Sequence, residues 1–149
     1  MYKSILVPLD GSKLAEGILL EIEKIALELK SRIILIRVSR AHVLPGVDPS
    51  DAQIRAVRQS EDYLQGLKRQ LTASGFEVEV HTPYGDSAEK ILETCSRYDF
   101  DLIAMSTHGR SGLGRWLLGS VAEKIVRHSE KPVLLLRAQK SIGNRFDDA

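Results

Sequence analysis

A segment rich in small residues, lying between two apolar runs, carries the clearest chemistry in this sequence. An apolar run over residues 102–105 stops at Ser106, and a glycine-rich stretch then leads to a helical pattern that begins at Ser120. Glycine lets a backbone approach a ligand closely, and a helix N-terminus presents unpaired N–H groups with a partial positive charge. Together these features suit a phosphate group. Glycine clusters also form tight turns that bind nothing, so the segment alone leaves both interpretations open.

Two widespread phosphate-binding patterns are absent from this stretch. The sequence has no G-x-x-x-x-G-K-[ST], which excludes a P-loop NTPase. It has no G-x-G-x-x-G either, because Leu117 stands where the third glycine would follow Gly112 and Gly114. Ser120 and Glu123 have the spacing of a capping box, which predicts that Ser120 starts and caps the following helix. Its hydroxyl could therefore bond a phosphate or serve only its own helix.

Alternating strand and helix patterns surround this segment and predict how it is positioned. Short apolar runs indicate strands and a 3.6-residue apolar period indicates helices. We predict strands over residues 3–9, 32–39, 76–83, 99–106 and 132–137, and helices over residues 14–30, 51–74, a short stretch from about 87, and 120–129. The predicted helical faces are Leu14, Ile18, Ile22, Ile25 and Leu29 in the first helix, and Ile54, Val57, Leu64, Leu67 and Leu71 in the second. Ser12 is the predicted N-cap of the first helix.

This alternation predicts an α/β fold with a five-stranded, doubly wound parallel sheet and right-handed crossovers. The third strand alternates apolar and polar residues, so it should lie at an edge, and the strand order 3-2-1-4-5 is the simplest that satisfies this. In that order strands 1 and 4 are neighbours at the switch point, where ligands bind beyond the carboxyl ends of strands. Asp10 ends strand 1 and residues 106–109 end strand 4, so the two polar stretches should converge on one crevice.

Composition narrows the functional classes. The chain has 149 residues, a formal charge of +1 and a single cysteine, Cys95. The low charge argues against nucleic acid as a main partner, and one cysteine cannot form an intrachain disulfide. No apolar run is long enough for a signal peptide or a membrane span, so we expect a cytoplasmic protein. We expect one domain over residues 1–138 with a polar tail over residues 139–149, an inert buried Cys95, and no histidine metal cluster.

The spacing of the small-residue segment resembles the universal stress protein family, in its ATP-binding branch. That family's nucleotide motif is G-x-x-G, nine residues, then G-[ST]; here Gly109 is followed by nine residues and then Gly119-Ser120. Ser106 stands in place of the first family glycine. Residues 5–12 resemble the family's first strand and turn, and residues 131–136 resemble its last strand. The resemblance spans residues 1–137 and implies a Rossmann-like fold, of the adenine nucleotide alpha hydrolase-like type, with the same strand order.

The resemblance also implies a set of nucleotide-binding residues. Main-chain groups of Val38 would read the adenine edge, and the phosphates would lie against the loop and the following helix. The implied contacts are Pro8, Leu9, Asp10, Val38, Met105, Ser106, Gly109, Gly119, Ser120 and Val121, with His108, Arg110 and Arg115 as further phosphate contacts. Judged by its chemistry, Asp10 could bond the ribose or base, hold a metal ion through water, or only form an Asx turn with Gly11 and Ser12.

The function that the resemblance implies is a nucleotide-dependent stress-response regulator. It would bind ATP, with Mg²⁺ or Mn²⁺ bridging the phosphates, form a homodimer through Val133 to Leu136, and act on a protein partner that the sequence does not identify. The sequence offers no base to orient water and no P-loop lysine, so we expect slow hydrolysis at best. Two alternatives stay open. Ser106 in place of glycine favours a nucleotide-free dimerisation module, and an adenylating enzyme would need an acceptor site that the sequence does not reveal.

Overall fold

Five parallel strands form one sheet in the order β3-β2-β1-β4-β5, as the sequence predicts. The structure, a computed structural model, describes residues 1–107 and 118–137. Its strands are β1 Ser4–Pro8, β2 Arg32–Ile36, β3 Val78–His81, β4 Leu102–Ser106 and β5 Val133–Leu136. Its helices are α1 Lys13–Glu16, α2 Leu19–Leu29, α3 Pro49–Ala73, α4 Ser87–Arg97 and α5 Ser120–His128. Each predicted strand is present, although most are shorter than the apolar run that predicts them.

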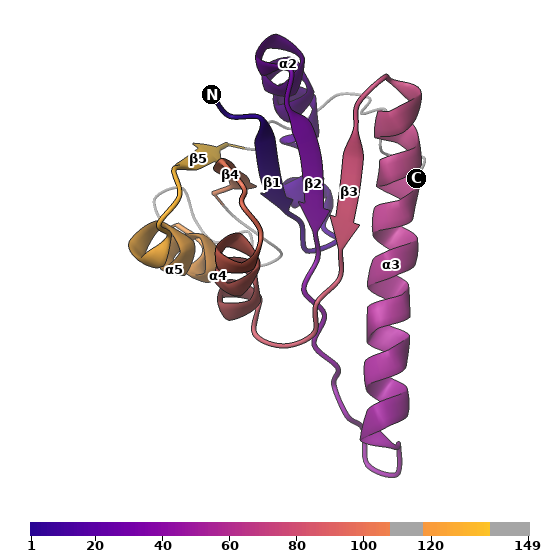
Figure 1. Cartoon of the computed structure of the whole chain (residues 1–149). Helices are drawn as coiled ribbons and strands as arrows, with labels where there is room; N and C mark the ends of the chain where they lie inside the picture. The colour runs from indigo at the N-terminus through magenta and orange to yellow at the C-terminus, as the bar shows by residue number, and fades with distance from the viewer. Residues whose placement is uncertain (108–117, 138–149) are drawn as a thin grey trace.

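Helices cover both faces of the sheet, which gives the protein three layers (Figure 1). On one face α1, α2 and α3 pack against alternate residues of the central strands, such as Ile5 and Val7. On the other face α4 and α5 pack against the intervening residues, such as Leu6 and Ile103. Side chains of a strand alternate between faces, so a strand buried on both sides must be apolar throughout. The uninterrupted apolar character of β1 and β2 follows from this geometry.

The edge position predicted for the third strand is confirmed. β3 pairs only with β2 among the strands, in parallel register from Ile33↔Val78 to Ile36↔His81. Val78 is buried, whereas Glu79 and His81 are partly exposed. A charged side chain on an edge strand discourages pairing with other chains. Beyond the regular pairing, Ser39 still meets Tyr84 in an isolated bridge, so the two chain segments stay together past the strand ends.

The single helix predicted over residues 14–30 is wrong, because the chain forms two helices there. Ser12 caps α1 as predicted, accepting a hydrogen bond from the Ala15 N–H at 3.1 Å. α1 ends at Glu16 with Gly17 as its C-cap, and α2 begins at Leu19. Ile18 and Ile22 are buried, but Leu14 is 37% exposed. The regular apolar period continues across the break, so periodicity alone does not reveal that the helix is interrupted at Gly17.

The long helix α3 is packed along only part of its length. Asp48 caps it and Pro49 occupies its first turn, which explains why it starts two residues before the prediction. Leu64, Leu67 and Leu71 are buried against the sheet, whereas Ile54 is 54% exposed. The N-terminal end of α3, at the bottom of the view, extends well past β3 (Figure 1). The predicted stripe is therefore a core face only where the sheet lies beneath it.

Candidate functional site

A cavity of about 320 Å³ lies beyond the carboxyl ends of β1, β2 and β4. This is the switch point of the sheet, since β1 pairs with β2 on one side and with β4 on the other. The lining residues come from both polar stretches that the sequence singles out and from the N-terminal turns of two helices. They are Pro8, Leu9, Asp10, Ala15, Ile36, Val38, Ser87, Ile91, Met105, Ser106, Gly119, Ser120, Val121 and Ala122. The volume falls within the range of small-molecule sites.

Asp10 forms one wall of this cavity and also shapes its own loop. The Ser12 N–H donates to Asp10 Oδ1 at 2.9 Å, and the Ser12 hydroxyl donates to the same oxygen at 2.5 Å. This is the Asx turn considered from the sequence. The carboxylate is partly exposed and lies at the end of β1, facing the ligand cavity. The turn therefore holds the carboxylate in place at the cavity wall, and the structural and ligand-binding roles are compatible.

A group of polar side chains, of which Glu16 is buried and Arg37 and Tyr63 are partly exposed, braces the Asp10 loop. Gly11 has φ +84°, and a Cβ built there would lie 2.9 Å from the Arg37 guanidinium. That guanidinium stacks over the ring of Tyr63, 4.8 Å from its centroid. Tyr63 in turn donates a hydrogen bond to Glu16 at 2.5 Å, and Glu16 is only 3% exposed. The loop, α1 and α3 are thus joined through side chains that the sequence analysis did not single out.

The Glu16 carboxylate in this brace has one hydrogen bond and one ion pair. Glu16 Oε1 accepts from Tyr63, but Glu16 Oε2 is buried without a hydrogen-bond partner. Lys13 Nζ lies 3.6 Å from Glu16 Oε2 as an ion pair. Burial, and then the hydrogen bond to Glu16, hold the pKa of Tyr63 well above its usual range. Tyr63 therefore stays protonated and remains a donor to the Glu16 carboxylate throughout the physiological range.

The opposite wall is formed by the end of β4 and the start of α5. Ser106 is buried, and the Thr107 N–H donates to the Leu136 carbonyl at 3.1 Å. The Gly119 N–H donates to the Thr107 carbonyl at 2.8 Å, which brings the start of α5 beside the end of β4. Thr107 and Gly119, which flank the residues outside the described ranges, are therefore hydrogen-bonded to each other. The two ends of the predicted phosphate loop lie together at the cavity.

The predicted capping box at this helix is wrong, although Ser120 is its first residue as expected. Gly119 is the N-cap, with an extended backbone, and no side-chain hydrogen bond caps the described N-terminus of α5. The Glu123 N–H donates instead to the Gly119 carbonyl at 2.9 Å. Ser120 already has helical geometry, so its hydroxyl cannot fill the N-cap position. The first N–H groups of α5 consequently lack a capping side chain where they border the cavity.

Most of the predicted site residues meet at this cavity. Its lining includes nine of them: Pro8, Leu9, Asp10, Val38, Met105, Ser106, Gly119, Ser120 and Val121. Gly109 and the three further phosphate candidates, His108, Arg110 and Arg115, lie outside the described residues. Five lining residues were not predicted from the sequence: Ala15, Ile36 and Ala122, and from α4 Ser87 and Ile91. The helix that starts near residue 87 was predicted, but the sequence pattern does not reveal that this helix reaches the site.

A second hollow adjoins the cavity and carries charge. It is lined by Arg40, Asp86, Ser87, Ala88, Ser120, Val121 and Lys124, of which three also line the main cavity. Arg40 Nη2 lies 3.3 Å from Asp86 Oδ2. Asp86 is also the N-cap of α4, accepting from the Glu89 N–H at 3.1 Å. That backbone hydrogen bond, aided by Lys124 and Arg40, holds the pKa of Asp86 below its usual range.

Three features outside this region concern the thiol, metal ligands and helix length. Cys95 is buried on α4, and burial raises the pKa of its thiol to about 11, which makes it an inert core residue. Within residues 1–107 and 118–137, no three of the histidine, cysteine, aspartate and glutamate side chains are grouped to hold a metal ion. In the same ranges, no helix combines the length and apolarity that a bilayer span requires.

Comparisons with known proteins agree with this architecture. Residues 1–137 match the model of the universal stress protein family. Universal stress protein MJ0531 of Methanocaldococcus jannaschii is 31% identical over 145 residues, covering 94% of this chain and 85% of the relative. The solved structure of MJ0577, from the same organism, is 27% identical with a TM-score of 0.79, and the match covers 95% of this chain and 99% of that one.

A more distant structure shows the same fold with a ligand in place. It is a universal stress protein family protein from Arabidopsis thaliana with AMP bound, 20% identical with a TM-score of 0.66 and 93% of each chain covered. The sheet order, the segment spacing and the match along nearly the whole chain lead to one conclusion. This chain belongs to the universal stress protein family.

Proposed function

We propose that this chain binds ATP at the switch-point cavity and works as a nucleotide-dependent regulator in the stress response. The observation that carries the proposal is the convergence at one cavity of the Asp10 carboxylate, at the end of β1, and the uncapped start of α5, beside the end of β4. An acidic group suited to ribose hydroxyls and, among the described residues, helix N–H groups without a capping side chain, suited to phosphates, then border the same space. The AMP-bound Arabidopsis protein supports this, because the same fold there holds an adenine nucleotide.

The chemistry of the lining divides the cavity between base and phosphates. Ile36, Val38, Ile91 and Met105 give it an apolar side that suits a purine ring. Val38 lies just beyond β2, where main-chain groups are free of the regular ladder to pair with an adenine edge. Ser120 and Val121 belong to the first turn of α5, whose N–H groups suit phosphate oxygens. The purine ring and the phosphates are thus each matched by lining residues of suitable chemistry.

The lining also fits a divalent ion that bridges phosphates. Mg²⁺ is commonly bound through one or two carboxylates together with phosphate oxygens and water, rather than by a cage of protein ligands. Asp10 is the one carboxylate among the described lining residues, and it would hold Mg²⁺ or Mn²⁺ through water. The ion would neutralise phosphate charge at the cavity. This donor set fits a phosphate-bridging ion better than a resident metal centre.

The lining favours binding over turnover. Asp10 is the only ionisable side chain among the described lining residues, and its Oδ1 already accepts two hydrogen bonds from Ser12. Hydrolysis of a phosphoanhydride needs a group that orients water and charge that stabilises the transition state. We therefore propose slow hydrolysis or none, and a role in which the bound nucleotide biases contact with a protein partner.

The proposed regulator is a homodimer that pairs through β5. β5 is an edge strand, and Val133 to Leu136 are half-buried. The carbonyls of Pro132 and Leu136 accept from Ile103 and Thr107 of the β4 side, so Val133 and Leu135 direct their backbone groups to the open edge. Antiparallel pairing with a second copy would satisfy those groups about a two-fold axis. Light scattering that gives a strict monomer at micromolar concentration would refute this part.

The test of ATP binding starts from purified protein. Any bound nucleotide is released by denaturation and identified by mass spectrometry, and the stripped protein is then titrated with ATP and Mg²⁺ by calorimetry. Gly119→Val, which places bulk beside the first turn of α5, should abolish the binding heat. Gly66→Val is the matched control, because a Cβ there meets only Arg69, at 3.9 Å on α3. Gly109→Val should behave as Gly119→Val does. Full ATP affinity in both site variants would refute the assignment.

A further inference from the structure

We infer that Arg40 and Lys124 form a cationic rim that makes the site selective for nucleotides with more phosphates, and that Asp86 competes with the ligand for these two cations. This inference rests on the proposed nucleotide function and deepens it. It concerns which adenine nucleotide the chain prefers, a question that the cavity alone leaves open. Adenosine, AMP and ATP share the base and ribose but differ in how far their charge extends beyond them.

The hollow at the rim adjoins the ligand cavity. Ser87, Ser120 and Val121 line both spaces, so the rim borders the first turn of α5, where the phosphates of the proposed ligand would lie. The main cavity is lined by no cation among the described residues, whereas the rim is lined by Arg40 and Lys124. A base and ribose can therefore be held entirely by the first space. Only a ligand with an extended negative group gains from the second.

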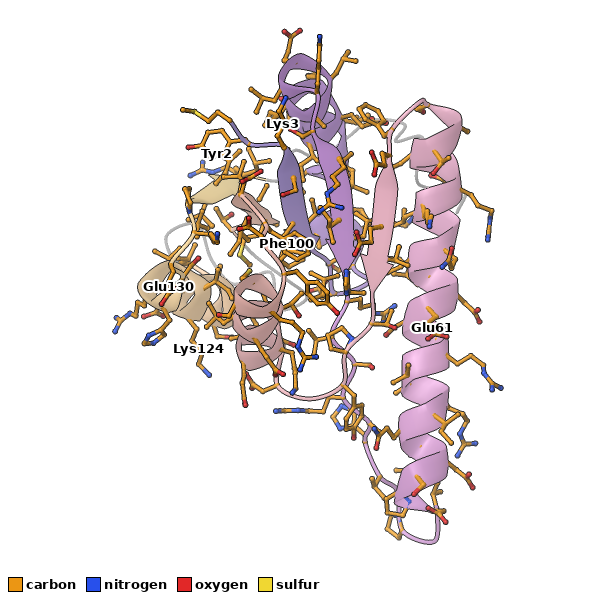
Figure 2. All side chains as sticks on the ribbon, viewed as in Figure 1. Tyr2, Lys3, Glu61, Phe100, Lys124 and Glu130 are labelled. Atoms are coloured by element: carbon orange, nitrogen blue, oxygen red, sulfur yellow. The ribbon has the colours of Figure 1, made fainter. Side chains whose placement is uncertain are left out.

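The three charged residues come from separate parts of the chain. Arg40 follows β2, Asp86 caps α4, and Lys124 lies one turn into α5. Figure 2 shows the Lys124 side chain extending outward from α5, away from the sheet. Because these residues are far apart in sequence, they share one rim only in the folded protein. No spacing rule would have grouped them.

The exposed ion pair between Arg40 and Asp86 can be replaced by a contact between Arg40 and a phosphate at little cost. The Arg40 side chain is 66% exposed and that of Asp86 is 38% exposed, so solvent screens their attraction. Asp86 keeps the Glu89 N–H as a hydrogen-bond donor if Arg40 moves away. A di- or triphosphate carries more charge than one carboxylate and can bind both cations together. Replacing the carboxylate by phosphate thus leaves no buried charge unpaired.

Calorimetric titration of the stripped full-length protein tests the inference with adenosine, AMP and ATP at constant Mg²⁺. Arg40→Gln and Lys124→Gln should each weaken ATP binding by about three- to tenfold, because each removes one screened contact to a charged group. The affinity for adenosine should change less than about twofold. The change in affinity for AMP should be intermediate between the changes for adenosine and ATP. Asp86→Asn keeps an N-cap acceptor but removes the competing charge, so it should tighten ATP binding. The differences should shrink at about 1 M salt.

The control is Arg127→Gln, which removes a cation from the same helix. Arg127 Nη2 pairs with Glu123 at 2.9 Å and does not line either hollow among the described residues. This variant should bind all three ligands as the unaltered chain does. Equal losses for adenosine and ATP in the Arg40 and Lys124 variants, or unchanged ATP affinity in both, would overturn the inference. Failure of the unaltered chain to bind any of the three ligands would instead overturn the proposed function.

Discussion

The two sides of the cavity are held in different ways. On the β1 side, the Asp10 loop rests on a partly buried group formed by Glu16, Tyr63 and Arg37, in which each member contacts the next. On the α5 side, Arg40 and Asp86 meet in an exposed ion pair. Buried polar contacts are costly to break, whereas exposed ion pairs contribute little to stability. One side is therefore fixed with the fold, and the other is held by a weaker, solvent-screened contact.

The largest effect should come from filling the space at Gly11. In Gly11→Ala the backbone must hold φ +84° and the methyl group must move the Arg37 guanidinium off its place over Tyr63, so we expect a loss of about 2–3 kcal/mol in the free energy of unfolding. Gly46→Ala is the control, with φ +83° and nothing within 4 Å of its Cβ. It should lose only about 1 kcal/mol from the backbone alone. Urea unfolding measures both, and equal losses would show that Arg37 does not brace the loop.

The next effect should come from removing the Tyr63 hydroxyl. Tyr63→Phe leaves the buried Glu16 carboxylate without its donor, and we expect a loss of about 1–3 kcal/mol. Hydrogen exchange should also accelerate around Asp10 and α1. Tyr98→Phe is the control, since Tyr98 is 41% exposed, and it should change stability by less than about 0.5 kcal/mol. If the two variants were equally stable, the brace would add nothing to the fold.

A smaller effect should appear in the pH dependence at the rim. The folded pKa of Asp86 lies below its ordinary value of 3.8, chiefly through the Glu89 N–H. Its ionised form therefore stabilises the fold above the ordinary pKa, and that contribution is lost as the pH falls through the folded value. The melting temperatures of the unaltered chain and Asp86→Asn should differ by a constant amount above about pH 5 and converge near pH 2. A difference in melting temperature that persists near pH 2 would show that ionised Asp86 is not its cause.

The smallest effect on stability should come from the rim cations. Arg40→Gln and Lys124→Gln remove exposed charges, and we expect melting temperatures within about 2 °C of the unaltered chain. Differential scanning fluorimetry without ligand checks this. Together with the loss in ATP affinity expected for the same variants, it would separate ligand response from fold stability. If the melting temperature fell as much as it does in Tyr63→Phe, the rim would contribute to fold stability as much as the Asp10 side of the cavity does.

Several elements of the fold could be predicted because their cause is local. The continuous apolar character of β1 and the alternation around β3 led to a central and an edge position, and both are confirmed. The break between α1 and α2 was missed, because the apolar period runs across Gly17 without a change. The N-cap of α5 was assigned one residue late for a similar reason, since Ser120 fits the motif but Gly119 has the required backbone.

The residues around the cavity also divide into those that could be predicted from the sequence and those that could not. Asp10 and Ser106 could be predicted as neighbours because both end adjacent strands of an inferred sheet. Glu16, Arg37 and Tyr63 could not, because each looks like an ordinary helix or strand-end residue until the chain is folded. Burial of Phe100 between the sheet and α4 likewise follows from packing, and Figure 2 shows it in that layer.

By itself, the sequence determined the order of strands and helices, the edge position of β3 and the two loops that meet at the switch point. These depend on hydrophobic period and turn chemistry, which act over a few neighbouring residues. The tertiary structure alone decided which polar groups come together beside Gly11, how far α3 extends past the sheet, and that Arg40, Asp86 and Lys124 share one rim. Such contacts join residues distant in sequence, and packing and burial set them only once the layers come together.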